Sequence, residues 1–159
     1  MTERAQLNSD IVHALHHYSG HAQQIGDRFA ALHHLGATDL QALMLILEAE
    51  REGRPLTPGA LGAELNFSSG AVTGLIDRLE GGGHVYRDRD PGDRRKVLLR
   101  YAEPAAAMAR SFFAPIARRA EGVLDQFSEA ELRTVHRFLT AMSAAMREHR
   151  DELHAGTAR

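Results

Sequence analysis

The chain has 159 residues, a length typical of one compact domain or of two lobes that share helices, and 43% of its residues are apolar. It contains no cysteine, which excludes a disulfide framework, thiolate metal ligands and peroxide sensing by a thiol of this chain. The formal net charge of -2 argues against a general polyanion binder, and no stretch resembles a signal peptide or a membrane span, so we expect a cytoplasmic protein with no membrane partner.

The N-terminal third is predicted to be helical. From Leu7 to Leu32 the apolar residues recur in two interleaved seven-residue series, which is the pattern of a long helix with a coiled-coil-like seam. We expect Gly36 to end this helix, and Thr38 with Gln41 to cap a second helix that runs to about residue 50. Residues 43–47 are all apolar, which predicts that the second helix is buried on every side.

The central segment has the order of a winged helix-turn-helix. Thr57 is expected to cap a third helix, Ser68 to cap a fourth, and the glycine triplet 81–83 to end it. Two strands are predicted at 85–87 and 97–101, joined by a Pro-Gly turn. In this arrangement the second short helix enters the major groove of DNA and the hairpin reaches the neighbouring backbone or the minor groove.

The exposed face of the fourth helix is predicted to be small and polar. Ser68, Ser69, Gly70 and Thr73 offer hydroxyls for phosphates or base edges, and the positive end of the helix favours phosphate. Glycine inside a helix costs about 1 kcal/mol relative to alanine, and close approach to another surface is one reason to keep it. The alternative is a helix that only forms a surface or a helix contact.

The predicted hairpin concentrates positive charge. From His84 to Arg100 six cations stand against three anions. Arg94, Arg95 and Lys96 project from a narrow support, which suits a phosphate surface. The alternative is a solvated run of charges that aspartates partly neutralise.

The last third is again predicted to be helical. One helix should run from about Pro104 to Asp125 with a kink one turn before Pro115, and Ser128 with Glu131 should cap the last helix.

The first and last helices carry more apolar surface than the winged segment can cover, so a partner chain is expected. The candidate dimerisation residues are Ile11, Leu15, Tyr18, Leu132, Val135, Leu139 and Met142. The expected fold is mainly α with a small β-hairpin wing, in which residues 37–103 form the DNA-binding domain and residues 1–36 and 104–159 the dimerisation helices.

The central residues resemble a known family. The stretch LTPGALGAELNFSSGAVTGLIDRLEGGGHVYRDRDPGDRRKVLLRY is similar to the DNA-binding core of the bacterial MarR family of regulators, and the most specific pieces are SSGAVTGLIDRLE and DPGDRR. The resemblance implies an obligate homodimer that binds a pseudo-palindromic operator, with a pocket for a small molecule, often a phenolic or other aromatic anion. It also implies a transcriptional regulator, more commonly a repressor, and no cofactor.

The resemblance assigns roles to individual residues. Ser68, Ser69, Gly70 and Thr73 would face the major groove. Arg95 would enter the minor groove, oriented by Asp93, with Arg94 and Lys96 beside it. Arg78 is similar to a family arginine that braces the wing or touches the DNA backbone. His84 stands where an aliphatic residue is usual, and Glu103-Pro104 replaces a glycine-containing link, so the join between wing and core is the part of the pattern in doubt.

Histidine is unusually frequent, with ten in the chain. His13, His17 and His21 are spaced by four residues on the first helix and could present adjacent imidazoles to a metal ion or to protons. We expect ordinary surface histidines, with metal or pH sensing as the alternative. His17, His21, Met44 and Phe112 are the candidate lining of the ligand pocket.

The leading hypothesis is therefore a dimeric, ligand-responsive regulator of transcription that binds double-stranded DNA. A winged domain used only for protein interaction is the alternative from another class. An enzyme is not expected, because no nucleophile, base and orienting group occur at a credible spacing.

Overall fold

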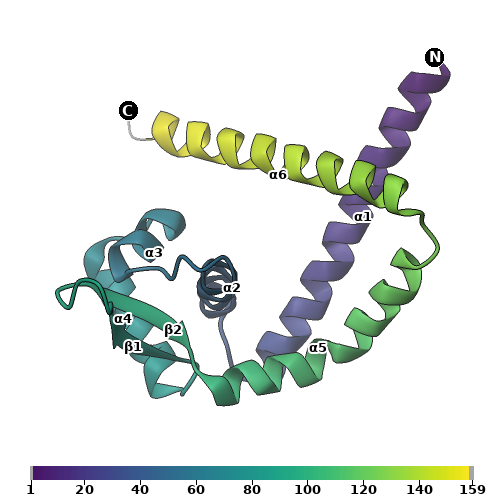
Figure 1. Cartoon of the computed structure of the whole chain (residues 1–159). Helices are drawn as coiled ribbons and strands as arrows, with labels where there is room; N and C mark the ends of the chain where they lie inside the picture. Colours follow the sequence, from purple (N-terminus) through teal and green to yellow (C-terminus); the bar gives the residue numbers. More distant parts are fainter. Residues whose placement is uncertain (1, 158–159) are drawn as a thin grey trace. The chain divides into compact units, whose positions relative to one another are not determined.

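The computed structural model describes the backbone of residues 2–157 and the side chains of residues 2–153 (Figure 1). It contains six helices and one two-stranded antiparallel sheet within these residues. The chain divides into two compact units, of which the first ends at Ala106 and the second begins at Ala107. This confirms the mainly helical fold with a β-hairpin wing.

The first two helices join through a tight turn. Helix α1 spans Glu3–Leu32 and α2 spans Ala37–Arg51. Gly36 does not end α1 but caps α2, and its N–H donates to the Asp39 carboxylate at 2.9 Å. The expected cap formed by Thr38 and Gln41 is therefore wrong, because α2 begins before Thr38 and the acidic residue three positions after Gly36 binds the free N–H.

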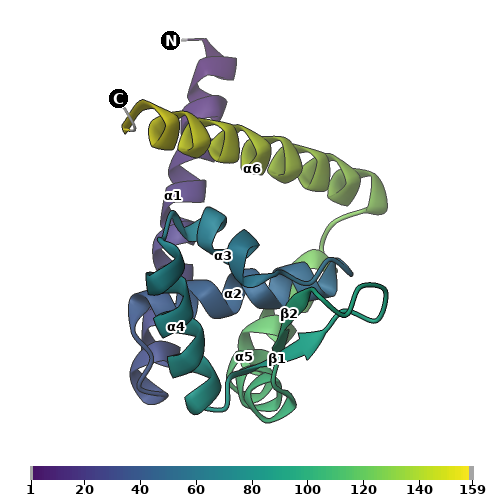
Figure 2. The ribbon, with the colours of Figure 1, turned by 90° about the vertical axis from the view of Figure 1, so that its left-hand side faces the viewer.

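Two short helices follow and pack against each other (Figure 2). Helix α3 spans Pro58–Leu65 and is capped by the Thr57 hydroxyl, which accepts from Ala60 N at 3.2 Å. Helix α4 spans Ser69–Gly81 and is capped by Ser68. Gly62 makes the close crossing possible, because a Cβ added there would lie 2.8 Å from the Val72 side chain. The predicted caps of both helices are confirmed.

The wing is a β-hairpin. Strand β1 spans Val85–Arg89 and β2 spans Val97–Tyr101, and their register pairs Arg87 with Leu99. The sheet is tied to the linker before α3, since Leu99 N donates to Leu56 O at 2.8 Å. The first strand is two residues longer than predicted.

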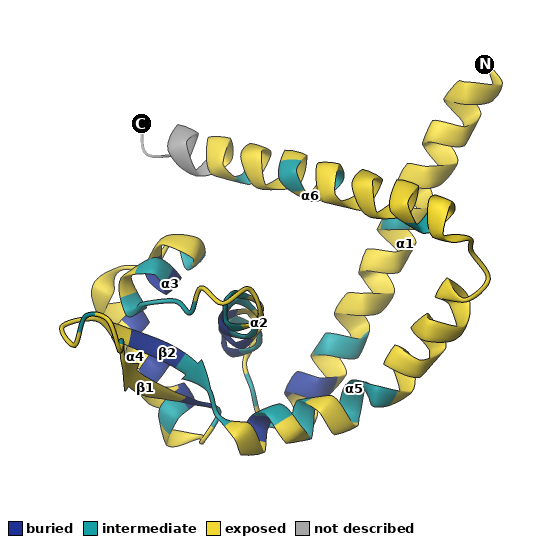
Figure 3. Cartoon of the chain, viewed as in Figure 1, coloured by how far each residue is buried: buried dark blue, intermediate teal, exposed yellow. Residues whose placement is uncertain are grey.

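The core of the first unit lies between α2, α3, α4 and the hairpin (Figure 3). Its buried members are all apolar: Ala42, Leu43, Ile46, Leu61, Val72, Leu75, Ile76, Leu79, Val85 and Leu99. Helix α2 contributes one face only, because Met44 is 54% exposed while Leu43 and Ile46 are buried. The expectation that α2 is buried on every side is therefore wrong in the single chain: four consecutive apolar residues cover the full circumference of a helix, and only one side of α2 meets the core.

The last two helices are long. Helix α5 spans Glu103–Leu124 and α6 spans Glu129–Thr157. Helix α5 continues through Pro115, and its ribbon bends along its length (Figure 1). The Ser128 N–H donates to Glu131 at 2.8 Å and Glu131 N donates to the Ser128 hydroxyl at 3.4 Å, which confirms the predicted cap.

Within the described residues, no single helix is long and apolar enough to cross a membrane. Helices α1 and α2 together have the length and composition for it, but only as a pair bent by 108°.

Candidate nucleic-acid interface

Helix α4 separates cleanly into a buried face and an exposed face. Its apolar residues Val72, Leu75, Ile76 and Leu79 are buried. The opposite face is exposed and carries Ser69, Gly70, Thr73, Gly74 and Asp77. The face that is free to meet a ligand is therefore small and polar.

The N-terminus of α4 presents donors to solvent. The Ser68 hydroxyl accepts from Ala71 N at 3.4 Å, and both residues are exposed. One turn further on, the Thr73 hydroxyl donates to the Ser69 carbonyl at 2.9 Å. The backbone N–H groups of the first turn and the positive end of the helix dipole favour an anion such as phosphate.

The two glycines on this face, Gly70 and Gly74, have open space beside them in the described part of the chain. A Cβ added at Gly70 or at Gly74 would meet nothing within 4 Å. Gly62 differs, because Val72 fills the space beside it. The space over Gly70 and Gly74 is open to an external surface that approaches the helix backbone closely.

The tip of the wing is shaped by aspartates. One carboxylate oxygen of Asp90 accepts from Gly92 N at 2.7 Å and from Asp93 N at 3.3 Å. The loop closes through Lys96 N, which donates to Asp93 O at 2.8 Å. These bonds fix the turn from within, so the basic side chains beside it remain available.

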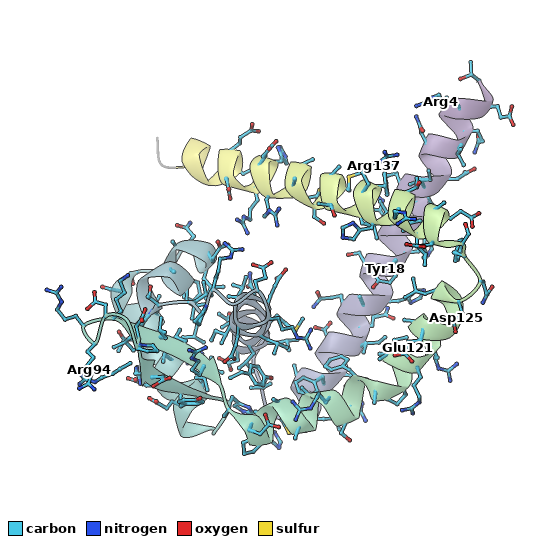
Figure 4. The ribbon with its side chains drawn as sticks, in the orientation of Figure 1. Arg4, Tyr18, Arg94, Glu121, Asp125 and Arg137 are labelled. Atoms are coloured by element: carbon cyan, nitrogen blue, oxygen red, sulfur yellow. The ribbon has the colours of Figure 1, made fainter. Side chains whose placement is uncertain are left out.

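The cations at the tip point into solvent. The Arg95 side chain is 94% exposed, and its only ion pair among the described residues is a long 3.4 Å contact between Nε and Asp93. Arg94 and Lys96 form no ion pair with the described residues, and Figure 4 shows Arg94 projecting from the end of the wing. Positive charge is thus concentrated where a phosphate backbone or a minor groove could receive it.

Arg87 joins the wing to α4. Its guanidinium donates to Asp77 at 2.6 Å and also pairs with Glu80, whose second oxygen accepts from Arg87 N at 3.1 Å. This contact is not predicted from the sequence. Asp77 and Glu80 are one turn apart on a helix, which would suit one shared cation, but the sequence does not say which arginine of the wing provides it.

Arg78 pairs with α2 instead of the wing. Its Nη2 and Nε donate to one oxygen of Asp39 at 2.6 and 3.0 Å. Asp39 is only 6% exposed, and this burial by itself raises the pKa of its carboxyl. The hydrogen bonds from Arg78 and from Gly36 N, together with the charge of Arg78, lower the pKa by more. The pKa of Asp39 therefore lies below its ordinary value. The ion pair between the wing and α4 is formed by Arg87 and not by Arg78, while a contact of Arg78 with the DNA backbone stays a prediction.

His84 stands at the entrance to β1. Its Nδ1 is buried without a hydrogen-bond partner among the described residues, while its backbone oxygen accepts from Ala102 N at 2.9 Å. Burial lowers the pKa of the imidazole, the nearby His33 lowers it further and Asp39 opposes them. The imidazole therefore favours its neutral form in the folded chain.

The candidate dimerisation residues lie on exposed or half-exposed faces. Tyr18 is 74% exposed and projects from α1 in Figure 4, and Ile11 is 36% exposed. On α6 Val135 and Leu139 are exposed. The remaining three candidates, Leu15, Leu132 and Met142, are half-buried.

Two of the candidate pocket residues lie one turn apart on α1. His17 and His21 border a shallow depression on α1 together with His13, His16, Gly20 and Gln24. Met44 on α2 is not part of its wall. A separate hollow of about 370 Å³ lies between α3 and α4 and is lined in part by Phe67, Ser69 and Thr73.

A capped helix-turn-helix with an open polar face, followed by a hairpin that ends in exposed cations, defines a winged-helix DNA-binding protein. The MarR family model matches residues 33–96. The HTH-type transcriptional regulator YcgE of Bacillus subtilis is 30% identical over 138 residues, which cover 82% of this chain and 87% of that protein. The chain belongs to the MarR family and is a DNA-binding transcriptional regulator.

Solved structures of the family share the fold. A point mutant of MepR from a multidrug-resistant clinical isolate of S. aureus matches with a TM-score of 0.67 at 17% identity, over 86% of this chain and 96% of that chain. A MarR family protein from Bacillus stearothermophilus matches with a TM-score of 0.60 at 24% identity, over 92% and 99%. MepR has also been solved in complex with DNA and bound to ethidium bromide, and those chains match with TM-scores of 0.53 and 0.56 at 18% identity, each over 85% of this chain.

Proposed function

We propose that the chain works as a homodimeric repressor that binds a pseudo-palindromic operator and leaves it when a small aromatic ligand binds. The observation that carries the DNA contact is the combination of an open glycine-containing face on α4 with solvent-exposed cations at the wing tip. In this proposal residues 37–103 form the DNA-binding domain, and residues 1–36 and 104–159 form the dimer.

The homodimer is supported by the apolar surface of the long helices. Helix α6 has no buried residue among its described side chains, yet it carries many large apolar ones. The exposed examples on α6 are Val135, Phe138, Leu139, Met146 and Leu153. A solvated helix does not need this composition, whereas an isologous contact with a second copy would cover it.

The operator follows from the symmetry of such a dimer. Two recognition helices related by a two-fold axis read two half-sites about 34 Å apart, one turn of DNA. We assign Ser68, Ser69, Gly70 and Thr73 to the major groove, with Arg95 in the adjacent minor groove. The solved MepR complex with DNA supports this use of the fold in the family.

Ligand control is the finer part of the proposal. Its support is the family itself, in which MepR has been solved with the aromatic compound ethidium bromide bound. By linkage, a ligand that weakens operator binding must itself bind less tightly to the DNA-bound dimer. We keep His17, His21, Met44 and Phe112 as the candidate ligand contacts.

The deciding experiment is the selection of bound genomic DNA by the purified full-length protein. We expect an enriched inverted repeat whose half-sites are one helical turn apart. Arg95→Ala should weaken binding to that repeat by about 1 to 3 kcal/mol. It should also reduce the slope of the logarithm of the binding constant against the logarithm of the salt concentration by about one. Arg137→Ala, an exposed arginine on α6, is the matched control and should bind like the wild type.

Two results would contradict the proposal. If the selected sequences contained no repeat, the symmetric operator would be wrong. If sedimentation at micromolar concentration gave a monomer, the dimer would be wrong, and Leu139→Glu provides the internal check because it should shift a true dimer toward monomer.

A further inference from the structure

Helix α1 carries a histidine pair that DNA binding does not use. His13 and His17 are one helical turn apart and exposed, and their Nε2 atoms lie 3.1 Å from each other. The two rings meet edge to face with their centroids 4.4 Å apart. Both side chains therefore direct a ring nitrogen to the same point on the helix surface.

The distance between the two nitrogens matches a metal chelate. Zinc–imidazole bonds of about 2.0 to 2.1 Å place two nitrogens in neighbouring positions of a tetrahedral or square site about 2.9 to 3.4 Å apart. Side chains at positions i and i+4 lie above one another on a helix, so no change of the backbone is needed to hold an ion between them. Small rotations of the two rings would let both nitrogens donate to one ion.

The surroundings leave room for the other ligands of the ion. The pair borders a shallow depression whose wall also includes Gly20, where an added Cβ would meet nothing within 4 Å. The ring of His21 lies one turn further on, with its centroid 6.5 Å from that of His17. Among the described residues no group of three or more metal-ligating side chains is arranged to hold an ion, so the described part of the chain supplies two ligands and water is left to fill the rest.

We propose that His13 and His17 form a binding site for one divalent transition-metal ion, Cu²⁺ or Zn²⁺, on the surface of α1. Imidazole suits both ions, and affinity at a nitrogen site is expected to be higher for Cu²⁺ than for Zn²⁺. A closed structural zinc site has four protein ligands, whereas a two-ligand exposed site exchanges its ion readily. Bound metal would link two successive turns of α1 and so stabilise that part of the helix.

The test uses the full-length protein without a histidine tag, and it needs no operator. Isothermal titration with Cu²⁺ or Zn²⁺ alone should show saturable binding of one ion per chain. The electron paramagnetic resonance spectrum of the Cu²⁺ form should show coupling to imidazole nitrogens. Both His13→Ala and His17→Ala should weaken binding at least tenfold. His136→Ala on α6 is the matched control, since this exposed histidine is outside the depression, and it should bind like the wild type.

Three results would overturn the proposal. These are the absence of saturable binding up to millimolar metal, binding that survives both α1 substitutions, and an equal loss in His136→Ala. Circular dichroism spectra of the metal-free variants that match the wild type would show that any loss reflects the missing ligands and not a change in folding. Failure of this test would leave the proposed operator binding untouched.

Discussion

Gly74 gives the sharpest test of how α4 meets DNA, because the same substitution should act in opposite directions on folding and on binding. The residue lies in the interior of α4, it is exposed, and a Cβ added there meets nothing within 4 Å. Gly74→Ala should therefore stabilise the fold by about 1 kcal/mol through helix propensity. For a chain of this size that corresponds to a rise in melting temperature of about 2 to 4 °C.

The methyl group should weaken operator binding. If the backbone of α4 lies against base edges, the added Cβ occupies space that the DNA fills, and overpacking of this kind costs about 1 to 3 kcal/mol. We expect operator affinity to fall at least about tenfold, equivalent to 1.4 kcal/mol. Fluorescence anisotropy with the selected operator at one fixed salt concentration measures this loss, and urea unfolding at one protein concentration measures stability.

Gly81→Ala is the matched control. Gly81 is also exposed with nothing within 4 Å of an added Cβ, but it is the last residue of α4 and lies far from the capped N-terminus. It should leave affinity unchanged. If Gly74→Ala raised stability and bound the operator like the wild type, close approach of this face to DNA would be refuted; if it lowered stability, the open space beside Gly74 would be wrong.

Three further predictions concern the packing around α4. Gly62→Ala should destabilise the fold, since the added Cβ would lie 2.8 Å from the Val72 side chain. The cost of overpacking, about 1 to 3 kcal/mol, exceeds the gain in helix propensity of about 1 kcal/mol. In a double-mutant cycle measured by urea unfolding, adding Val72→Ala should restore part of the lost stability. His84→Phe should make the free energy of unfolding less dependent on pH. The pKa of His84 is lowered in the folded chain, so the unfolded chain takes up the proton at a higher pH than the folded chain does. The stability of the wild type should therefore fall as the pH drops below about 6.5, and the variant should not show this fall. Arg87→Ala should reduce operator affinity more than stability, because it frees the wing from α4 but removes only partly exposed ion pairs; equal losses in anisotropy and unfolding free energy would contradict this.

The parts of the fold that sequence predicts well are those that local chemistry decides. Thr57, Ser68 and Ser128 are each followed by residues that favour a helix, and each caps a helix in the structure. The glycine triplet 81–83 ends α4, and Gly83 adopts a positive φ of 71°. Such signals need only the residues within one turn, which is why they can be identified without knowing the fold.

The contacts that sequence misses join distant segments. Arg78 pairs with one carboxylate oxygen of Asp39, 39 positions away, while the other oxygen accepts from Gly36 N at the start of α2. Arg87 belongs to the basic hairpin by sequence, but in the fold it forms ion pairs with Asp77 and Glu80 of α4. A local charge count treats all six cations alike, while the fold neutralises Arg87 and Arg100 and leaves the tip charged.

The hydrogen bond between the Thr73 hydroxyl and the Ser69 carbonyl limits the bases that this helix can read. The hydroxyl hydrogen is engaged within α4, so toward a major groove Thr73 offers an oxygen that only accepts and a methyl group. An acceptor fits the amino groups of adenine or cytosine, and a methyl group fits the methyl of thymine, whereas guanine presents two acceptors there and gains nothing from either. The base that contacts Thr73 is therefore expected to be adenine, cytosine or thymine, and a G·C pair at that position is expected to turn its cytosine toward Thr73.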